Sequence, residues 1–148
     1  MTRPDVFIDT SGWFRYVVRG RSEAEDRASG EVRRAVERCV RDRVPLWTTN
    51  LVVAETHQLL VSRTNRATAR LFLGALPLPR LEVVTSTPDL ESRALREWID
   101  RFDGEDFSLC DAVSFAVMAE QGIRSALALD GHFEVAGFAV LPARKTAR

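Results

Sequence analysis

The sequence contains few of the residues that build disulfide or zinc frameworks. It has two cysteines, Cys39 and Cys110, and two histidines, His57 and His132. Because the cysteines lie far apart in a chain that looks intracellular, we expect free thiols. Neither histidine forms a zinc-binding spacing with a cysteine. We therefore expect neither a disulfide nor a zinc centre.

Long apolar runs are also missing. No stretch approaches the roughly 20 apolar residues that span a bilayer, and residues 1–5 lead into a short apolar run that ends at Asp9, unlike a signal peptide. We expect no membrane partner and a cytoplasmic location. The length of 148 residues is that of one domain. We predict a single domain over residues 1–142 and a loose basic tail over residues 143–148.

The chain has no excess of charge of one sign. It has 21 basic and 21 acidic residues, and Lys145 is the only lysine. A net charge of zero argues against a general electrostatic clamp on nucleic acid, but it does not exclude a nuclease whose positive charge surrounds a negative centre. Arg15, Arg19 and Arg21 could hold phosphates, although a solvated helix face is the simpler interpretation.

Short apolar runs alternate with amphipathic segments along the chain. The runs predict strands at residues 6–8, 46–47, 81–84, 126–129 and 138–141. Helices are predicted at residues 11–18, 25–42, 51–62, 66–76 and 108–121, and another begins at Thr87-Pro88. This alternation predicts an α/β domain with a mostly parallel sheet and right-handed crossovers.

Two aspartates directly follow predicted strands. Asp9 follows the first strand, and Asp130 follows the strand at residues 126–129. Binding sites of open parallel sheets gather beyond the carboxyl ends of the strands, so both positions favour a site. Asp9 could instead cap the next helix. Asp130 could form a turn with Gly131, although the flanking apolar runs are too far apart for a two-residue hairpin.

Two further acidic residues lie within predicted helices. Glu55 falls on an apolar side of its helix, where a carboxylate is costly unless it is paired, protonated or bound to a cation. A salt bridge to an arginine is the structural alternative. Asp111 lies in the most apolar helix of the chain, where Ser108 and Asp111 resemble a capping box. A first-turn aspartate could cap the helix and point into a cleft at once.

Taken together, the four carboxylates predict a cation site. Each close pair of such charges repels by about 4 kcal/mol at an effective dielectric constant near 20, and a divalent cation would relieve that repulsion. Oxygen ligands favour magnesium or manganese over zinc. We predict that Asp111→Asn raises the stability of the metal-free protein by relieving this repulsion; a marked loss of stability would favour the capping role.

The ordered motifs resemble those of PIN domains, and in particular the VapC-type toxins of bacterial toxin–antitoxin pairs. The matching segments are residues 6–11 (VFIDTS), 50–60, 109–118 and 129–133 (LDGHF), so the resemblance extends over roughly residues 5–142. It implies a three-layer α/β/α sandwich and a ribonuclease that cleaves RNA internally. Asp9, Glu55, Asp111 and Asp130 would bind Mg²⁺ or Mn²⁺, with Ser11 as a polar support. An RNA substrate, a protein antitoxin and a homodimer are also implied.

Two positions depart from the family pattern. Many relatives have threonine or serine where this chain has Ala128, and threonine where it has Cys110. Hydroxyl groups beside the ligands are lost, but no carboxylate is. The alternatives to a nuclease are a PIN domain that binds RNA or protein without cutting, and a phosphoaspartate protein. The second usually needs a lysine near the site, and the only lysine is in the tail.

Overall fold

Five parallel strands form the central sheet of the computed structural model, which describes residues 4–143. The strands are β1 (Val6–Ile8), β2 (Leu46–Thr49), β3 (Leu81–Val84), β4 (Ser125–Leu127) and β5 (Ala139–Leu141). The helices are α1 (Thr10–Val17), α2 (Glu23–Arg41), α3 (Asn50–Arg63), α4 (Arg66–Ala75), α5 (Pro88–Ala94), the π-helix η1 (Leu95–Asp100), α6 (Leu109–Gln121) and α7 (His132–Val135). The predicted α/β class is confirmed. After Ala143, the predicted basic tail lies outside the described residues.

Polar caps set where several helices begin, as the sequence predicted for Thr87 and Ser108. Thr49, Thr87 and Ser108 each accept a hydrogen bond from the backbone N–H three residues further on. At the other end of α6, Gly122 adopts the left-handed conformation with φ of 69°, which glycine tolerates without a Cβ clash. These boundaries depend on local chemistry, which is why the sequence located them well.

The end of β4 differs from the prediction. The apolar run predicted a strand at residues 126–129, whereas β4 ends at Leu127. The backbone N–H of Leu129 donates to the hydroxyl of Ser11 at 2.9 Å, so this part of the chain bonds to α1 rather than continuing the strand. Asp130 therefore follows the strand across a short connection that α1 holds in place.

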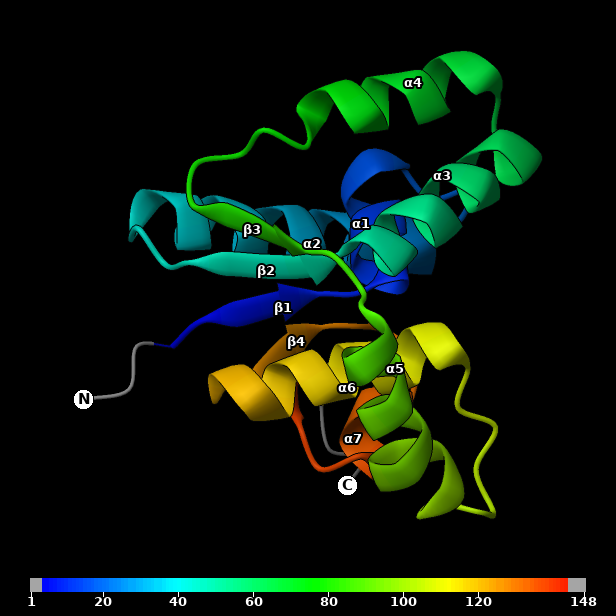
Figure 1. The fold of residues 1–148 in the computed structure, drawn as a ribbon. Coiled ribbons are helices and arrows are strands. Elements are labelled where there is room, and N and C mark those ends of the chain that lie inside the picture. Colours follow the sequence, from blue (N-terminus) through cyan, green and yellow to red (C-terminus); the bar gives the residue numbers. More distant parts are fainter. Residues whose placement is uncertain (1–3, 144–148) are drawn as a thin grey trace, which may run out of the picture.

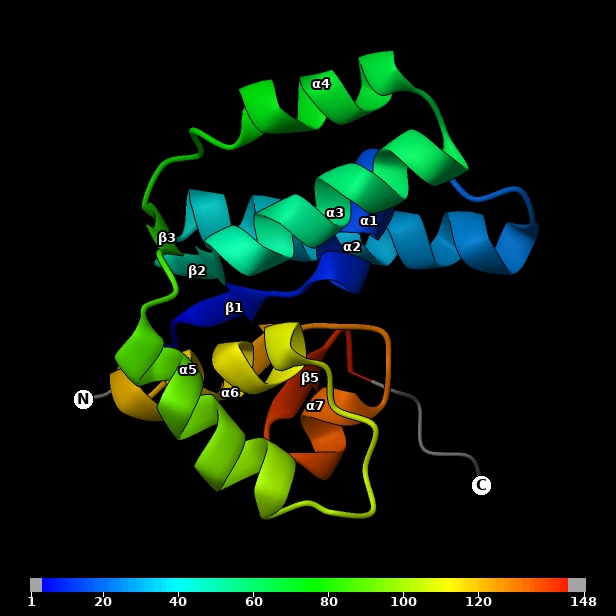
Figure 2. The ribbon, with the colours of Figure 1, turned by 45° about the vertical axis from the view of Figure 1, so that its right-hand side comes forward.

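The strand order places a topological switch point between β1 and β4. The order is β3-β2-β1-β4-β5, so the chain moves outward from β1 to β3 and then crosses to the other side of β1. Because parallel crossovers are right-handed, this reversal puts α1–α4 and α5–α7 on opposite faces of the sheet. The two helix groups lie apart in both views (Figures 1 and 2). The three-layer arrangement that the family resemblance implied is confirmed.

The core extends over both faces of the buried strand β1. On one side, Trp13 of α1 meets Phe72 of α4 with ring centroids 5.6 Å apart. On the other, Phe115 of α6 meets Phe133 of α7 at 4.9 Å. Within residues 4–143, no helix is both long and apolar enough to cross a membrane.

A glycine allows α1 to pack closely on the end of β4. A Cβ atom at Gly12 would lie 2.4 Å from the carbonyl oxygen of Leu127, far inside van der Waals contact. Only glycine fits at this distance without a shift of the backbone. The close approach brings the neighbouring Ser11 to the chain that follows β4.

Candidate active site

Asp9 lies at the carboxyl end of β1, beside β4. Its backbone N–H donates to the carbonyl of Leu127 at 3.1 Å, and its carbonyl accepts from Trp13 at the start of α1. The carboxylate is 2% exposed and makes no capping bond to the helix, so side-chain capping by Asp9 is excluded. Instead the carboxylate accepts a hydrogen bond from Ser11 at 3.1 Å. Ser11 therefore holds Asp9 and also accepts from Leu129, joining the ends of both strands.

The surroundings of Asp9 disfavour its charge. Burial, then the charge of Asp130 and, more weakly, that of Asp111 together raise the pKa of Asp9 from 3.8 to about 7. Hydrogen bonds from the Thr10 backbone and from Ser11 act in the opposite direction but do not compensate. Three acidic side chains therefore lie close enough to repel one another.

Asp111 combines helix capping with a place in the cluster. Its carboxylate accepts from the backbone N–H of Ser108 at 3.3 Å, and the hydroxyl of Ser108 accepts from the N–H of Asp111 at 3.0 Å. The capping box predicted from the sequence is confirmed. The same Oδ2 atom lies 2.8 Å from Nδ1 of His132, so the carboxylate also faces the cluster. Both interpretations of Asp111 hold together.

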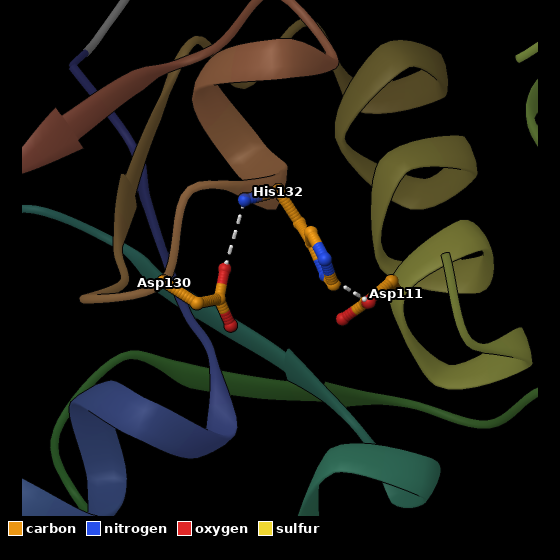
Figure 3. A group of neighbouring side chains, drawn as sticks. All are labelled: Asp111, Asp130 and His132. Atoms are coloured by element: carbon orange, nitrogen blue, oxygen red, sulfur yellow. Dashed lines mark hydrogen bonds and ion pairs between the residues drawn. The ribbon is translucent and has the colours of Figure 1, made fainter. Parts of the chain in front are cut away.

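Asp130 lies across from Asp111, and the ring of His132 contacts Asp111 (Figure 3). One ligand atom from each of these three side chains lies within 4.8 Å of the others. Asp130 Oδ1 accepts from the backbone N–H of His132 at 3.1 Å, which turns the chain so that both side chains point the same way. Asp130 thus forms a local turn, but β4 and β5 are parallel, so it is not a hairpin turn.

His132 is a site residue that the sequence reasoning missed. Its ring lies between Asp111 and the ring of Phe107, whose centroid is 5.5 Å away in an edge-on arrangement. Although burial lowers the pKa of His132, the hydrogen bond to Asp111 and the charges of Asp111, Asp130 and Glu105 raise it above its ordinary value overall. The available signal was its place two residues after Asp130, in the same motif.

Glu55 does not lie where the helical pattern placed it. The expectation of a carboxylate on the apolar side of the helix is wrong, because Glu55 is exposed. The buried stripe of α3 consists of Val52, Thr56 and Leu60, and Glu55 lies just beside it. Its carboxylate nevertheless reaches Cys110, where burial and then the charge of Glu55 raise the pKa of the thiol, with a hydrogen bond between the two side chains.

Cys110 connects Glu55 to the other acids. The charges of Asp9 and Asp111 also raise the pKa of this buried thiol, so all three carboxylates lie near one side chain. Within residues 4–143, arginine ion pairs involve other acids: Glu25, Asp42, Asp89 and Glu120. The alternative of a structural salt bridge to Glu55 therefore finds no support. The surroundings are rich in carboxylate oxygens and suit a hard divalent cation, with one imidazole as a further neighbour.

A parallel sheet with acidic side chains at its switch point is the arrangement that the motifs anticipated. Residues 6–139 match the PIN domain family. The chain belongs to the PIN-domain family, and the resemblance stated from the motifs is confirmed.

Individual proteins are also similar to this chain. The chain is 37% identical over 143 residues to the 23S rRNA-specific endonuclease VapC20 of Mycobacterium tuberculosis, covering 90% of this chain and 95% of that protein. The crystal structure of VapC20, described as a sarcin–ricin loop cleaving toxin, matches with a TM-score of 0.75 and 34% identity over 91% of this chain and 97% of that one.

A more distant structure shares the fold. VapBC2 from Rickettsia felis, bound to a DNA fragment from its promoter, matches with a TM-score of 0.65 at 11% identity. The match covers 91% of this chain and 96% of the other. At this identity the likeness concerns the fold alone.

Proposed function

We propose that this protein is a divalent-metal-dependent endoribonuclease and the toxin of a toxin–antitoxin pair. The observation that carries the proposal is the convergence of Asp9, Asp111 and Asp130 beyond the ends of β1 and β4. Its relative VapC20 is named for cleavage of 23S rRNA and of the sarcin–ricin loop. A structured RNA is accordingly the proposed substrate class, and the cytoplasm, where such RNA occurs, is the proposed location.

The side chains fit a magnesium or manganese ion. Asp9, Glu55, Asp111 and Asp130 would hold it, because the buried Asp9 faces two further carboxylates and would ionise readily beside a cation. When bound, such an ion supplies the positive charge that stabilises the phosphate in the transition state and favours ionisation of the attacking water. This chain's residues fix the ligands: Ser11 orients Asp9, while the first turn of α6 and His132 orient Asp111.

Cys110 retains part of the role of the hydroxyl that it replaces. Its thiol lies close enough to Glu55 for the two side chains to interact, as a threonine hydroxyl in that position could. The departure from the family pattern therefore preserves a partner for Glu55, which favours a competent site over a purely binding one.

The proposed partners follow from the same assignment. A toxin requires an antitoxin protein that blocks it, and the VapBC2 structure is a complex of that kind by its name. We propose that the neighbouring gene encodes such an antitoxin, and that the toxin forms a homodimer.

A cleavage assay tests the function. Purified protein is incubated with a sarcin–ricin loop RNA and with an unstructured RNA, each in magnesium, manganese or EDTA. We expect metal-dependent internal cleavage and a loss of more than about 100-fold in Asp130→Asn, because loss of residues that only support ligands already costs about 10–100-fold. Asp42→Asn is the matched control, since Asp42 lies in an exposed ion pair at the end of α2.

A melting experiment separates metal binding from cleavage. Metal at 100 times its dissociation constant should stabilise the protein by about 2.7 kcal/mol, and each kcal/mol raises the melting temperature by roughly 2–4 °C. RNA binding without cleavage would identify the non-cutting alternative. Cleavage that is unchanged in EDTA or in Asp130→Asn would reject the proposal.

A further inference from the structure

An arginine-rich groove lies beside the candidate active site. We call it the arginine groove and define it by Phe14, Arg15, Arg19, Arg21, Glu25 and Arg63. It lies between α1, the start of α2 and the end of α3. A second hollow shares Phe14, Arg15, Glu25 and Arg63 with it, so the two form one continuous depression.

The inner end of this depression reaches the acidic cluster. Ser11 and Leu129 line the second hollow. The hydroxyl of Ser11 donates to Asp9 at 3.1 Å and accepts from the backbone N–H of Leu129 at 2.9 Å. An RNA strand lying in the arginine groove would therefore come within one hydrogen-bonded side chain, Ser11, of the carboxylate of Asp9.

The groove concentrates positive charge in a protein whose net charge is zero. Four arginines line it against one glutamate. The ion pair between Arg15 and Glu25 is long, at 3.9 Å, and 45% of the Glu25 side chain is exposed, so it is weak. Within residues 4–143, Arg19, Arg21 and Arg63 have no carboxylate within ion-pair distance. These guanidinium groups are available for an anionic ligand.

Phe14 adds an aromatic surface to this charge. The side chain is half-buried, and the guanidinium carbon of Arg15 lies 5.4 Å from the centre of its ring. An aromatic ring beside arginines is the combination with which proteins hold single-stranded nucleic acid, because the ring stacks on a base and the arginines contact phosphates. An acidic peptide would use the charge but not the ring.

We infer that the arginine groove binds the RNA strand on one side of the cleaved bond. Phosphates contact Arg15 and Arg63, and an unpaired base stacks on Phe14. This inference rests on the proposed function and adds to it a substrate path that leaves the acidic cluster between α1 and α3.

RNA binding by protein variants that cannot cleave RNA tests this path. All variants carry Asp130→Asn so that RNA stays intact, and the probe is a fluorescent single-stranded RNA of about ten nucleotides, long enough for one such groove. Arg15→Gln with Arg63→Gln should weaken binding about tenfold or more and reduce the slope of log affinity against log salt by about 1.4, at about 0.7 per phosphate contact. Phe14→Leu should weaken binding about tenfold with an unchanged slope.

Matched controls distinguish the groove from general charge. Arg38→Gln with Arg41→Gln removes two exposed arginines at the far end of α2 and should leave the slope unchanged. Arg19→Gln with Arg21→Gln changes only exposed positions and should also lower the slope, even if the first pair disturbs folding. The inference would be overturned if the salt slope were unchanged in both double variants of the groove, or if it fell equally in the Arg38/Arg41 control. The groove would then be a candidate binding site for a protein segment instead of RNA. Because cleavage is measured separately on the parent protein, failure of the groove and failure of the nuclease assignment are distinguishable.

Discussion

At the scale of single residues, repulsion between carboxylates dominates the energetics of the site. Asp9 is buried against two other carboxylates, and its pKa of about 7 records how unfavourable its ionised form is without a cation. Asp111 has more support, because it lies in the first turn of α6 and beside His132. Neutralising these two aspartates should therefore have opposite effects on the metal-free protein.

Asp9→Asn should stabilise the metal-free protein at neutral pH. The folded protein binds the Asp9 proton more tightly than the unfolded chain, whose pKa is 3.8, so this aspartate lowers stability progressively as the pH rises from about 4 to about 7. Asp9→Asn lacks this pH dependence, and its free energy of unfolding above pH 7 should exceed that of the wild type by up to about 4 kcal/mol. Urea unfolding across this pH range in EDTA measures it. Asp111→Asn, which the sequence predicted to stabilise, should instead destabilise, because it loses the negative charge that lies in the first turn of α6 and faces His132. Equal stability of wild type and Asp9→Asn at high pH would contradict the account.

His132 should act by orienting Asp111. His132→Ala removes the 2.8 Å contact to the carboxylate and should weaken manganese affinity and slow cleavage by about 10–100-fold, as expected for a residue that supports a ligand. His132→Asn can place an amide nitrogen near the position of Nδ1 and should recover much of the loss. Calorimetric titration with manganese and single-turnover cleavage measure the two effects. Full metal affinity in His132→Ala would show that His132 does not support metal binding.

At the scale of elements, packing of α1 on β4 builds the site. Gly12 allows the helix to approach the carbonyl of Leu127, and this approach places Ser11 where it can bond both Asp9 and Leu129. The relative placement of β1, α1 and the chain after β4 therefore depends on the close approach at Gly12.

Gly12→Ala should therefore reduce both stability and cleavage. A Cβ atom 2.4 Å from the Leu127 carbonyl oxygen forces α1 away from β4, at a cost of about 1–3 kcal/mol, even though alanine is the better helix former. Thermal melting and the cleavage rate measure the two losses. Gly104→Ala is the control, because nothing lies within 4 Å of a Cβ there. If Gly12→Ala were as stable and active as the control, the close approach would not be needed for stability or cleavage.

At the scale of the whole molecule, the strand order determines where chemistry can occur. The reversal between β1 and β4 leaves a space beyond their carboxyl ends, and residues far apart in the chain meet there. Helices α3 and α4 also carry exposed apolar side chains. Leu71 on α4 is 72% exposed, and Val61 at the end of α3 is 44% exposed.

The proposed homodimer should depend on this surface. A second copy that covered Leu71 and Val61 would remove apolar area from water. We expect the wild-type protein to show the mass of a dimer in light scattering and Leu71→Arg to show that of a monomer. Leu95→Arg, at a leucine that is 48% exposed in η1, serves as the control and should remain dimeric. A wild-type monomer, or a dimer unaffected by Leu71→Arg, would reject this surface.

The sequence by itself determined the elements and the identity of the acidic candidates. Short apolar runs become strands and hydroxyl caps start helices because these choices depend on neighbouring residues. Asp9, Asp111 and Asp130 could be selected because a carboxylate at the end of a buried strand or in an apolar helix has few structural uses. The assignment of all four carboxylates as metal ligands stays a prediction.

Only the tertiary structure decided which of these residues meet. Contact between Asp111 and His132 joins positions 21 residues apart, and the bond from Leu129 to Ser11 spans 118. The exposure of Glu55 and the early end of β4 likewise depend on how α1 and α3 pack, which no local pattern encodes. A linear sequence specifies preferences over a few residues, whereas burial and distance arise only when remote segments pack together.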